Sequence, residues 1–232
     1  MENVPIIYED DDMLALDKPV GMITNTSITS GPGTLQELVA LGYPELFDSS
    51  KKESDFHVRN GLVHRLDKDT SGVLLFAKNE EAFEYLAQQF KNREVKKEYL
   101  ALVVGEVEDE NIEIRAPIGR SPKAKRKMAV VEGGRDSVTG IEKIQTMTLH
   151  NKTLTWVRVK PLTGRTHQIR VHLAALNHPV VGDNLYEGRR RSLTSRDEFG
   201  RLMLHAHKLM IKHPTSHKML TLTAPKPDSF SY

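Results

Sequence analysis

Short segments of β-type sequence recur along this chain, and turn-forming residues end most of them. Residues 6–18 read as two short strands around an acidic turn, and residues 72–78 form an apolar run of the length of a buried strand. Residues 143–149 and 153–159 read as a hairpin, and 202–211 and 219–223 as further strands. Such runs of strands predict an α+β fold with a mixed, mostly antiparallel sheet and flanking helices.

Two helices are expected beside these strands. Asn79 can cap a helix whose apolar residues recur on one face as far as Phe90. Residues 166–176 fit a second helix, which Asn177 can close in the left-handed conformation. Residues 42–60 are polar and irregular and are expected to form a loop.

Length and composition exclude several classes of protein. The 232 residues contain no apolar run near 20, so no transmembrane helix is expected, and no secretory signal opens the chain. The absence of cysteine excludes disulfides, thiolate metal sites and a thiol nucleophile. We expect a cytoplasmic protein with one domain, residues 1–232, acting as a monomer and not at a membrane.

Charge is close to balanced, with 33 basic and 31 acidic side chains, but it is unevenly distributed. Residues 115–131 hold six basic side chains and no acid, and residues 189–191 are three arginines in a row. Basic segments on a nearly neutral chain indicate a surface for a polyanion. A solvated loop is the alternative for either segment alone.

The segment His64-Arg65-Leu66-Asp67-Lys68-Asp69-Thr70-Ser71-Gly72 gathers charged groups and hydroxyls immediately before an apolar strand. Groups that must meet a ligand are often placed in such a loop. Arg65 and Lys68 would favour the ionised form of Asp67, which could then act as nucleophile or base. A turn that caps the strand, with its charges in water, is the alternative.

A second constellation runs from Leu162 to Leu173 and contains Gly164-Arg165-Thr166-His167-Gln168-Ile169-Arg170. If the helix begins at Thr166, its free amides favour an anion at the Gly164 loop. Arg170 then shares a stripe with His167 and can reach a carboxylate from elsewhere. A partly buried arginine that satisfies carbonyl groups is the alternative.

Together these segments resemble the motifs of the RluA-type pseudouridine synthases. The first is similar to the motif around that family's catalytic aspartate. Five further segments match in family order over residues 6–225: Lys18-Pro19-Val20-Gly21, Lys97 to Ala101, Pro117 to Val130, His178 to Asp183, and Leu204-His205-Ala206. The resemblance implies the bent sheet of the pseudouridine synthase fold. Unlike many relatives, the chain shows no N-terminal S4 RNA-binding domain, because it begins almost directly at the catalytic region.

The resemblance implies an isomerase that turns a uridine in structured RNA into pseudouridine, with no cofactor and no metal. The base must be flipped out of its stack. Asp67 is implied as the catalytic group, either by covalent attack or by assisting elimination, with Arg170 paired to it. Tyr99 is implied to stack on the uracil, Leu204 to wall it, and Arg65 to fill the gap in the RNA. The implied phosphate contacts are Lys123, Lys125, Arg126, Lys127, Arg189 and Arg190.

Rival readings have less support. His167 and His172 are five residues apart and so lie on different helix faces, and His205 and His207 lack a third ligand in sequence, which argues against a metal. The kinase catalytic loop reads His-Arg-Asp, not His-Arg-Leu-Asp, and no glycine-rich phosphate loop is present. A catalytically silent RNA-binding protein of the same fold remains the alternative. The sequence leaves the RNA open, although we favour ribosomal over transfer RNA.

Overall fold

The computed structural model describes residues 4–26, 32–44, 46–47, 54–124, 127–149, 151–187 and 199–230. The chain divides into two compact units, residues 1–96 with 206–225 and residues 97–205 with 226–232. Few helices and many strands, paired antiparallel wherever their register is described, give the expected α+β class. No helix among the described residues is long and apolar enough to cross a membrane.

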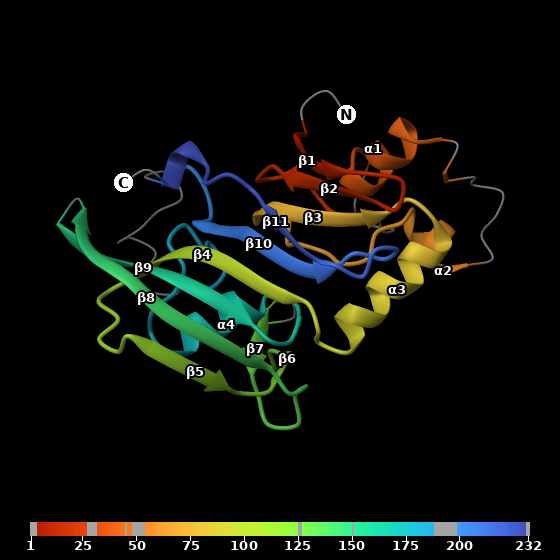
Figure 1. Cartoon of the computed structure of the whole chain (residues 1–232). Coiled ribbons are helices and arrows are strands. Elements are labelled where there is room, and N and C mark those ends of the chain that lie inside the picture. The colour runs from red at the N-terminus through yellow and green to blue at the C-terminus, as the bar shows by residue number, and fades with distance from the viewer. Residues whose placement is uncertain are drawn as a thin grey trace. The chain divides into compact units, whose positions relative to one another are not determined.

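The first unit contains strands β1 (Ile6–Glu9), β2 (Met13–Lys18) and β3 (Ser71–Ala77), which lie side by side in that order (Figure 1). β3 is followed by β10 (Leu204–Lys212), whose first two residues belong to the second unit, and β10 pairs antiparallel with β11 (Met219–Thr223). The acidic turn, the buried strand and the two C-terminal strands are confirmed. Every residue of β3 is buried, as its unbroken apolar run predicts.

Helix α3 (Glu80–Lys91) follows β3 and confirms the predicted cap, because the Asn79 side chain accepts a hydrogen bond from the amide of Ala82. Helix α1 (Leu35–Gly42) was not expected, although Thr34 and Glu37 form a capping box that the sequence contains. The loop predicted over residues 42–60 is wrong in part, because α2 (Asp55–Arg59) lies in it. There Phe56 is buried in contact with Phe47 and Phe83, which local polarity does not reveal.

The second unit is organised around β4 (Lys96–Val104), β9 (Lys152–Pro161), β8 (Val138–Leu149) and β5 (Asn111–Arg115), adjacent in that order. β8 and β9 form the predicted hairpin, which is long and easily followed in Figure 1. A small separate sheet pairs β6 (Ile118–Arg120) antiparallel with β7 (Met128–Val130), and we call this pair of strands the basic hairpin. The buried faces of the strands pack with helix α4 (Gln168–Ala175) into one hydrophobic core, and the short helix η2 (Asp228–Phe230) adds Phe230 to it.

Candidate active site

Asp67 lies in the loop between α2 and β3, in the first unit. The amide of Thr70 donates to the carbonyl of Asp67 at 3.1 Å, which closes a turn with Lys68 and Asp69 at its tip. Thr70 is buried, Lys68 is exposed, and Asp67 itself is half-buried. The aspartate therefore sits at a point where the chain passes from solvent into a buried strand.

The main chain of this loop is held by the Lys-Pro-x-Gly element. Lys18 is fully buried, and its ammonium group donates to the carbonyls of Lys68 at 3.0 Å, Pro19 at 2.9 Å and Met22 at 2.7 Å. The amide of Gly21 donates to the same Lys68 carbonyl at 2.9 Å. The residue directly after Asp67 is thus fixed from two sides by a segment fifty residues earlier. The resemblance to the family singles out this element in the sequence, and the contacts of the Lys18 ammonium give it a role.

A second hydroxyl contact holds the residue before the aspartate. Thr24 is buried, and its hydroxyl donates to the carbonyl of Leu66 at 2.7 Å. The backbone on both sides of Asp67 is therefore anchored through its main-chain oxygens.

The two ends of the loop are fixed as well. The Nε2 atom of His64 accepts the amide of Leu75 at 3.1 Å, and its ring stacks on Phe90 with centroids 4.8 Å apart. Gly72 has φ +111°, and a Cβ there would meet the Ala206 carbonyl oxygen at 2.2 Å, so the close approach of β10 requires glycine. The histidine and the glycine of the motif are structural.

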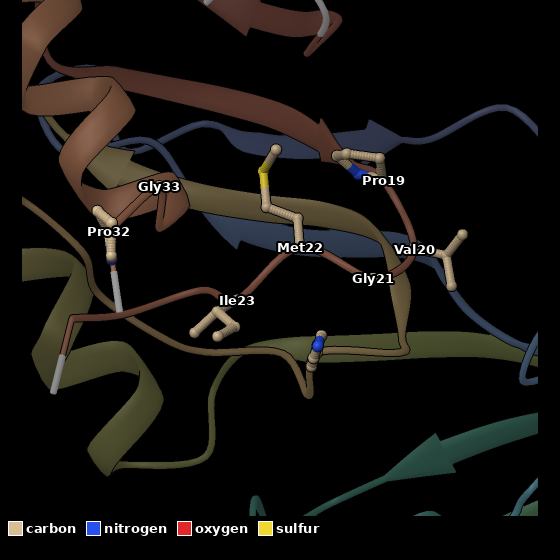
Figure 2. Close-up of a pocket in the computed structure, with 8 residues that line it drawn as sticks. Pro19, Val20, Gly21, Met22, Ile23, Pro32 and Gly33 are labelled. Carbon is tan, nitrogen blue, oxygen red and sulfur yellow. The ribbon is translucent and has the colours of Figure 1, made fainter. Parts of the chain in front are cut away.

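A hollow of 390 Å³ borders this loop, lined by Pro19, Val20, Gly21, Met22, Ile23, Pro32, Gly33 and Lys68. Figure 2 shows the segment from Pro19 to Ile23 leaving β2 along one side of the hollow, with Pro32 and Gly33 at the start of α1. Because Lys68 belongs to the lining, the hollow lies beside the turn that carries Asp67.

Three other predicted site residues lie where they can be described. Arg65 is exposed on the Asp67 loop. Tyr99 is half-buried in β4, opposite Val159 of β9, and packs in part against the core of the second unit. Leu204 is 3% exposed and packs in that core. Contacts of Arg65, Tyr99 and Leu204 with a uracil stay predictions.

Helix α4, which carries Arg170, begins two residues later than predicted. His167 has φ +55° and precedes the helix, so the expected helical stripe of His167 and Arg170 is wrong. The amide of Arg165, beside Gly164, is also not available to an anion, because a side chain of the protein already binds it. The Gln168 side chain fills this turn, accepting hydrogen bonds from the Arg165 amide at 3.0 Å and the Thr163 hydroxyl at 2.7 Å. The left-handed conformation predicted for Asn177 is confirmed.

Arg170 is buried and forms a two-pronged ion pair with Asp183. Its Nε lies 2.7 Å from Oδ2, and its Nη2 lies 2.9 Å from Oδ1. The exposed fractions of the two side chains are 9% and 0%, so the pair is shielded from water. Asp183 follows Gly182, where a Cβ would meet the Arg201 carbonyl oxygen at 2.1 Å. Asp183 lies in one of the family segments, but the sequence does not reveal this pair, because thirteen residues separate the partners.

Tyr186 packs against the same arginine. Its ring centroid lies 5.1 Å from the Arg170 guanidinium carbon and 5.9 Å from the Lys127 ammonium. Its hydroxyl accepts the amide of Met128 at 3.0 Å and lies 2.8 Å from Nδ1 of His167. The end of the basic hairpin and the arginine therefore meet at one tyrosine.

The basic residues predicted to bind phosphate are described only in part. Lys123 is exposed and Lys127 is half-buried beside Tyr186. Lys125, Arg126, Arg189 and Arg190 lie outside the described residues. Among the residues that are described, no three histidine or acidic side chains gather into a possible metal site. Asp67 and Arg170 belong to different units, and their pairing stays a prediction.

Comparison with known proteins completes the description. Residues 12–175, which include Asp67, Tyr99 and Arg170, match the model of the family "RNA pseudouridylate synthase". Over 97% of its length the chain is 38% identical to "Ribosomal large subunit pseudouridine synthase D" of Nitrosomonas europaea, of which it spans 63%, and 36% identical to the protein of that name from Pseudomonas aeruginosa, of which it spans 69%.

The solved structure "Human RNA Pseudouridylate Synthase Domain Containing 1" is similar with a TM-score of 0.77 and 32% identity, covering 97% of this chain and 84% of that one. A family match over most of the chain and relatives of this identity agree with the motifs and with the α+β fold. The chain belongs to the RNA pseudouridylate synthases, a family of isomerases.

Proposed function

We propose that this chain isomerises uridine in RNA to pseudouridine. The N1–C1′ bond breaks and a C5–C1′ bond forms; the proton leaves C5 and N1 gains one, so atoms and charge balance without an external reagent. The observation that carries the proposal is the anchored Asp67 loop, which sets a half-buried carboxylate on a main chain held by Lys18 and Thr24. A catalytic group needs such fixed placement before substrate arrives.

Asp67 is the catalytic residue in this proposal. It acts on the flipped nucleotide either by attack or by assisting elimination at the sugar, and Arg170 pairs with it. Tyr99 stacks on the uracil, Leu204 walls it, and Arg65 fills the space in the RNA stack. The burial of Arg170 supports its part, because a guanidinium shielded from water interacts strongly with a carboxylate.

The RNA backbone is bound by Lys123, Lys125, Arg126, Lys127, Arg189 and Arg190. The support is the concentration of positive charge in two segments of a nearly neutral chain. The substrate class is RNA of the large ribosomal subunit, as in the names of the Nitrosomonas and Pseudomonas relatives. Residues 1–232 act as one catalytic domain and as a monomer in the cytoplasm, without metal or cofactor.

The test is a map of pseudouridine in total RNA from cells with and without the gene. We expect one or a few positions of large-subunit ribosomal RNA to lose pseudouridine in the deletion strain. Re-expression of the wild-type chain should restore them, and re-expression of Asp67→Asn should not. An unchanged map in cells whose RNA still binds the purified protein would favour the catalytically silent alternative. Loss confined to transfer RNA would correct the substrate class.

A further inference from the structure

Arg170 is held by more than an ion pair. Asp183 binds the guanidinium through Nε and Nη2, and the guanidinium carbon lies over the Tyr186 ring, 5.1 Å from its centroid. A two-pronged ion pair and a ring contact together restrict a planar cation more than either contact alone. Asp183 and Tyr186 therefore both constrain the Arg170 guanidinium within the second unit.

The two partners are built into one turn. The Oδ1 atom of Asp183, which accepts from Arg170, also accepts the amides of Leu185 at 3.0 Å and Tyr186 at 3.2 Å. The amide of Gly182 donates to the Glu187 carboxylate at 2.8 Å and closes the same segment. The aspartate thus sets the backbone that presents Tyr186 to the arginine.

Tyr186 also contacts the basic hairpin through its hydroxyl. Met128, whose amide donates to that hydroxyl, is the first residue of β7, and Lys127 beside it places its ammonium 5.9 Å from the same ring. One ring thus lies next to two cations, one on the helix and one on the hairpin. A displacement of β7 would move Tyr186, and with it the surface against which Arg170 rests.

We propose that Tyr186 is a positioning residue that, with Asp183, orients Arg170 and links it to the β6–β7 hairpin. Engagement of the hairpin by the RNA backbone then favours the orientation of Arg170 that the reaction requires. The inference rests on the proposed function, because it concerns the arginine of that site. It adds Asp183 and Tyr186 to the residues on which turnover depends, and neither need touch the uridine.

The experiment uses total RNA labelled with [5-³H]uridine from cells that lack the gene, since isomerisation releases the C5 hydrogen. Enzyme in excess gives the single-turnover rate, and filter binding of the same RNA gives the dissociation constant. Tyr186→Leu removes the ring and the hydroxyl, and should slow the rate about tenfold, the range of a desolvated cation–π contact, with the dissociation constant changed by less than about threefold. Tyr186→Phe keeps the ring on Arg170 and should slow it about threefold.

Tyr43→Leu is the matched control. Tyr43 is also half-buried, lies 5.6 Å from a lysine ammonium, Lys78, and bonds a carboxylate, Glu9, through its hydroxyl. It belongs to the first unit and is remote in sequence from Arg170. The control should lose stability to urea in the same way as Tyr186→Leu and keep the wild-type single-turnover rate.

A double-mutant cycle separates positioning from general support of the fold. If Tyr186 acts through Arg170, Tyr186→Leu should slow an Arg170→Lys enzyme by less than about twofold, because lysine has no planar face to orient. A further tenfold loss in that background would overturn the inference, as would a Tyr186→Leu enzyme weakened only in RNA binding or unchanged. If Tyr186→Leu does not fold, a wild-type rate for Tyr186→Phe overturns it. A wild-type chain that releases no tritium would instead sink the proposed function, and this role with it.

Discussion

The loop that carries Asp67 and the Arg170 cluster, which consists of Arg170, Asp183 and Tyr186, are held in place by different kinds of contact. Around Asp67, the described anchors Lys18, Thr24 and Gly21 bind main-chain carbonyls of the neighbouring residues. Around Arg170, the contacts join side chains to one another, through the Asp183 carboxylate and the Tyr186 ring. The described anchors of the loop thus act on its main chain, whereas the described contacts of Arg170 act on its side chain.

The kind of contact decides whether a functional side chain can be changed without disturbing the groups that hold it in place. A main-chain scaffold stays in place when the functional side chain is changed, so the Asp67 carboxylate can be removed without removing its support. A side-chain cluster gives no such separation, because each member supports the others. Removal of the Asp67 carboxylate should therefore stop turnover and spare the fold, whereas loss of an anchor should weaken the fold first.

Asp67→Asn should have the largest effect, a loss of turnover below detection with folding and RNA binding kept. The change replaces a carboxylate with an amide of nearly the same size and leaves the Lys18 and Thr24 contacts to the main chain in place. Tritium release, RNA filter binding and urea unfolding measure the three properties. Turnover within about tenfold of wild type, or about 1.4 kcal/mol of transition-state stabilisation, would contradict the assignment.

Asp69→Asn is the control for that variant. It lies two residues on in the same half-buried turn and makes the same chemical change. It should keep turnover within about tenfold of wild type. If neither variant has measurable turnover, the reaction needs the combined charge of the turn and not the Asp67 carboxylate alone.

Lys18→Met should have the next largest effect, and mainly on stability. Methionine fills a similar volume but offers no donor to the carbonyls of Pro19 and Met22, while Lys68 keeps its bond from Gly21. Two partly buried carbonyls that lose this donor should cost about 2 kcal/mol of unfolding free energy. Urea unfolding measures it. Lys78→Met, at a more exposed lysine that donates to Glu9 and the Asp10 carbonyl, should cost clearly less. Equal losses would mean that burial of the Lys18 ammonium is not what holds the loop.

The sequence predicts local features of both regions and misses the contacts between distant residues. The β3 strand, the Asn79 cap and the β8–β9 hairpin each follow from a signal in one short continuous segment, and each is confirmed. The helix α4 begins at Gln168, two residues after the predicted start at Thr166. The structure instead uses a left-handed His167 and the Gln168 side chain, a choice fixed by the surrounding fold.

The candidate site divides in the same way. The family motifs indicate which residues carry the chemistry, Asp67 and Arg170 among them, without showing what supports each. The Lys18 ammonium binds a carbonyl fifty residues away. Arg170 contacts Asp183 and Tyr186, which follow the end of α4 in the chain. No periodicity or spacing encodes these contacts, because they depend on how separate segments fold back on one another.

Thr24→Val should have the smallest effect, and it gives the sharpest test of the main-chain scaffold. Valine keeps the shape of threonine and loses only the hydroxyl that donates to Leu66 at 2.7 Å, so the expected cost is about 1 kcal/mol of stability. Thr155→Val is the control, because the Thr155 hydroxyl is equally buried and donates to the Gly105 carbonyl at 2.8 Å in the second unit. That hydroxyl also accepts the Val107 amide at 3.1 Å, so the control should lose at least as much stability as Thr24→Val. Both variants should lose stability in urea. Only Thr24→Val should also slow single turnover, by about threefold, since Leu66 precedes Asp67 and small errors in the placement of a catalytic group reduce its rate. Equal rates in the two variants would show that the hydroxyl supports the fold without placing the carboxylate, and the anchoring of the loop would then depend on Lys18 and Gly21.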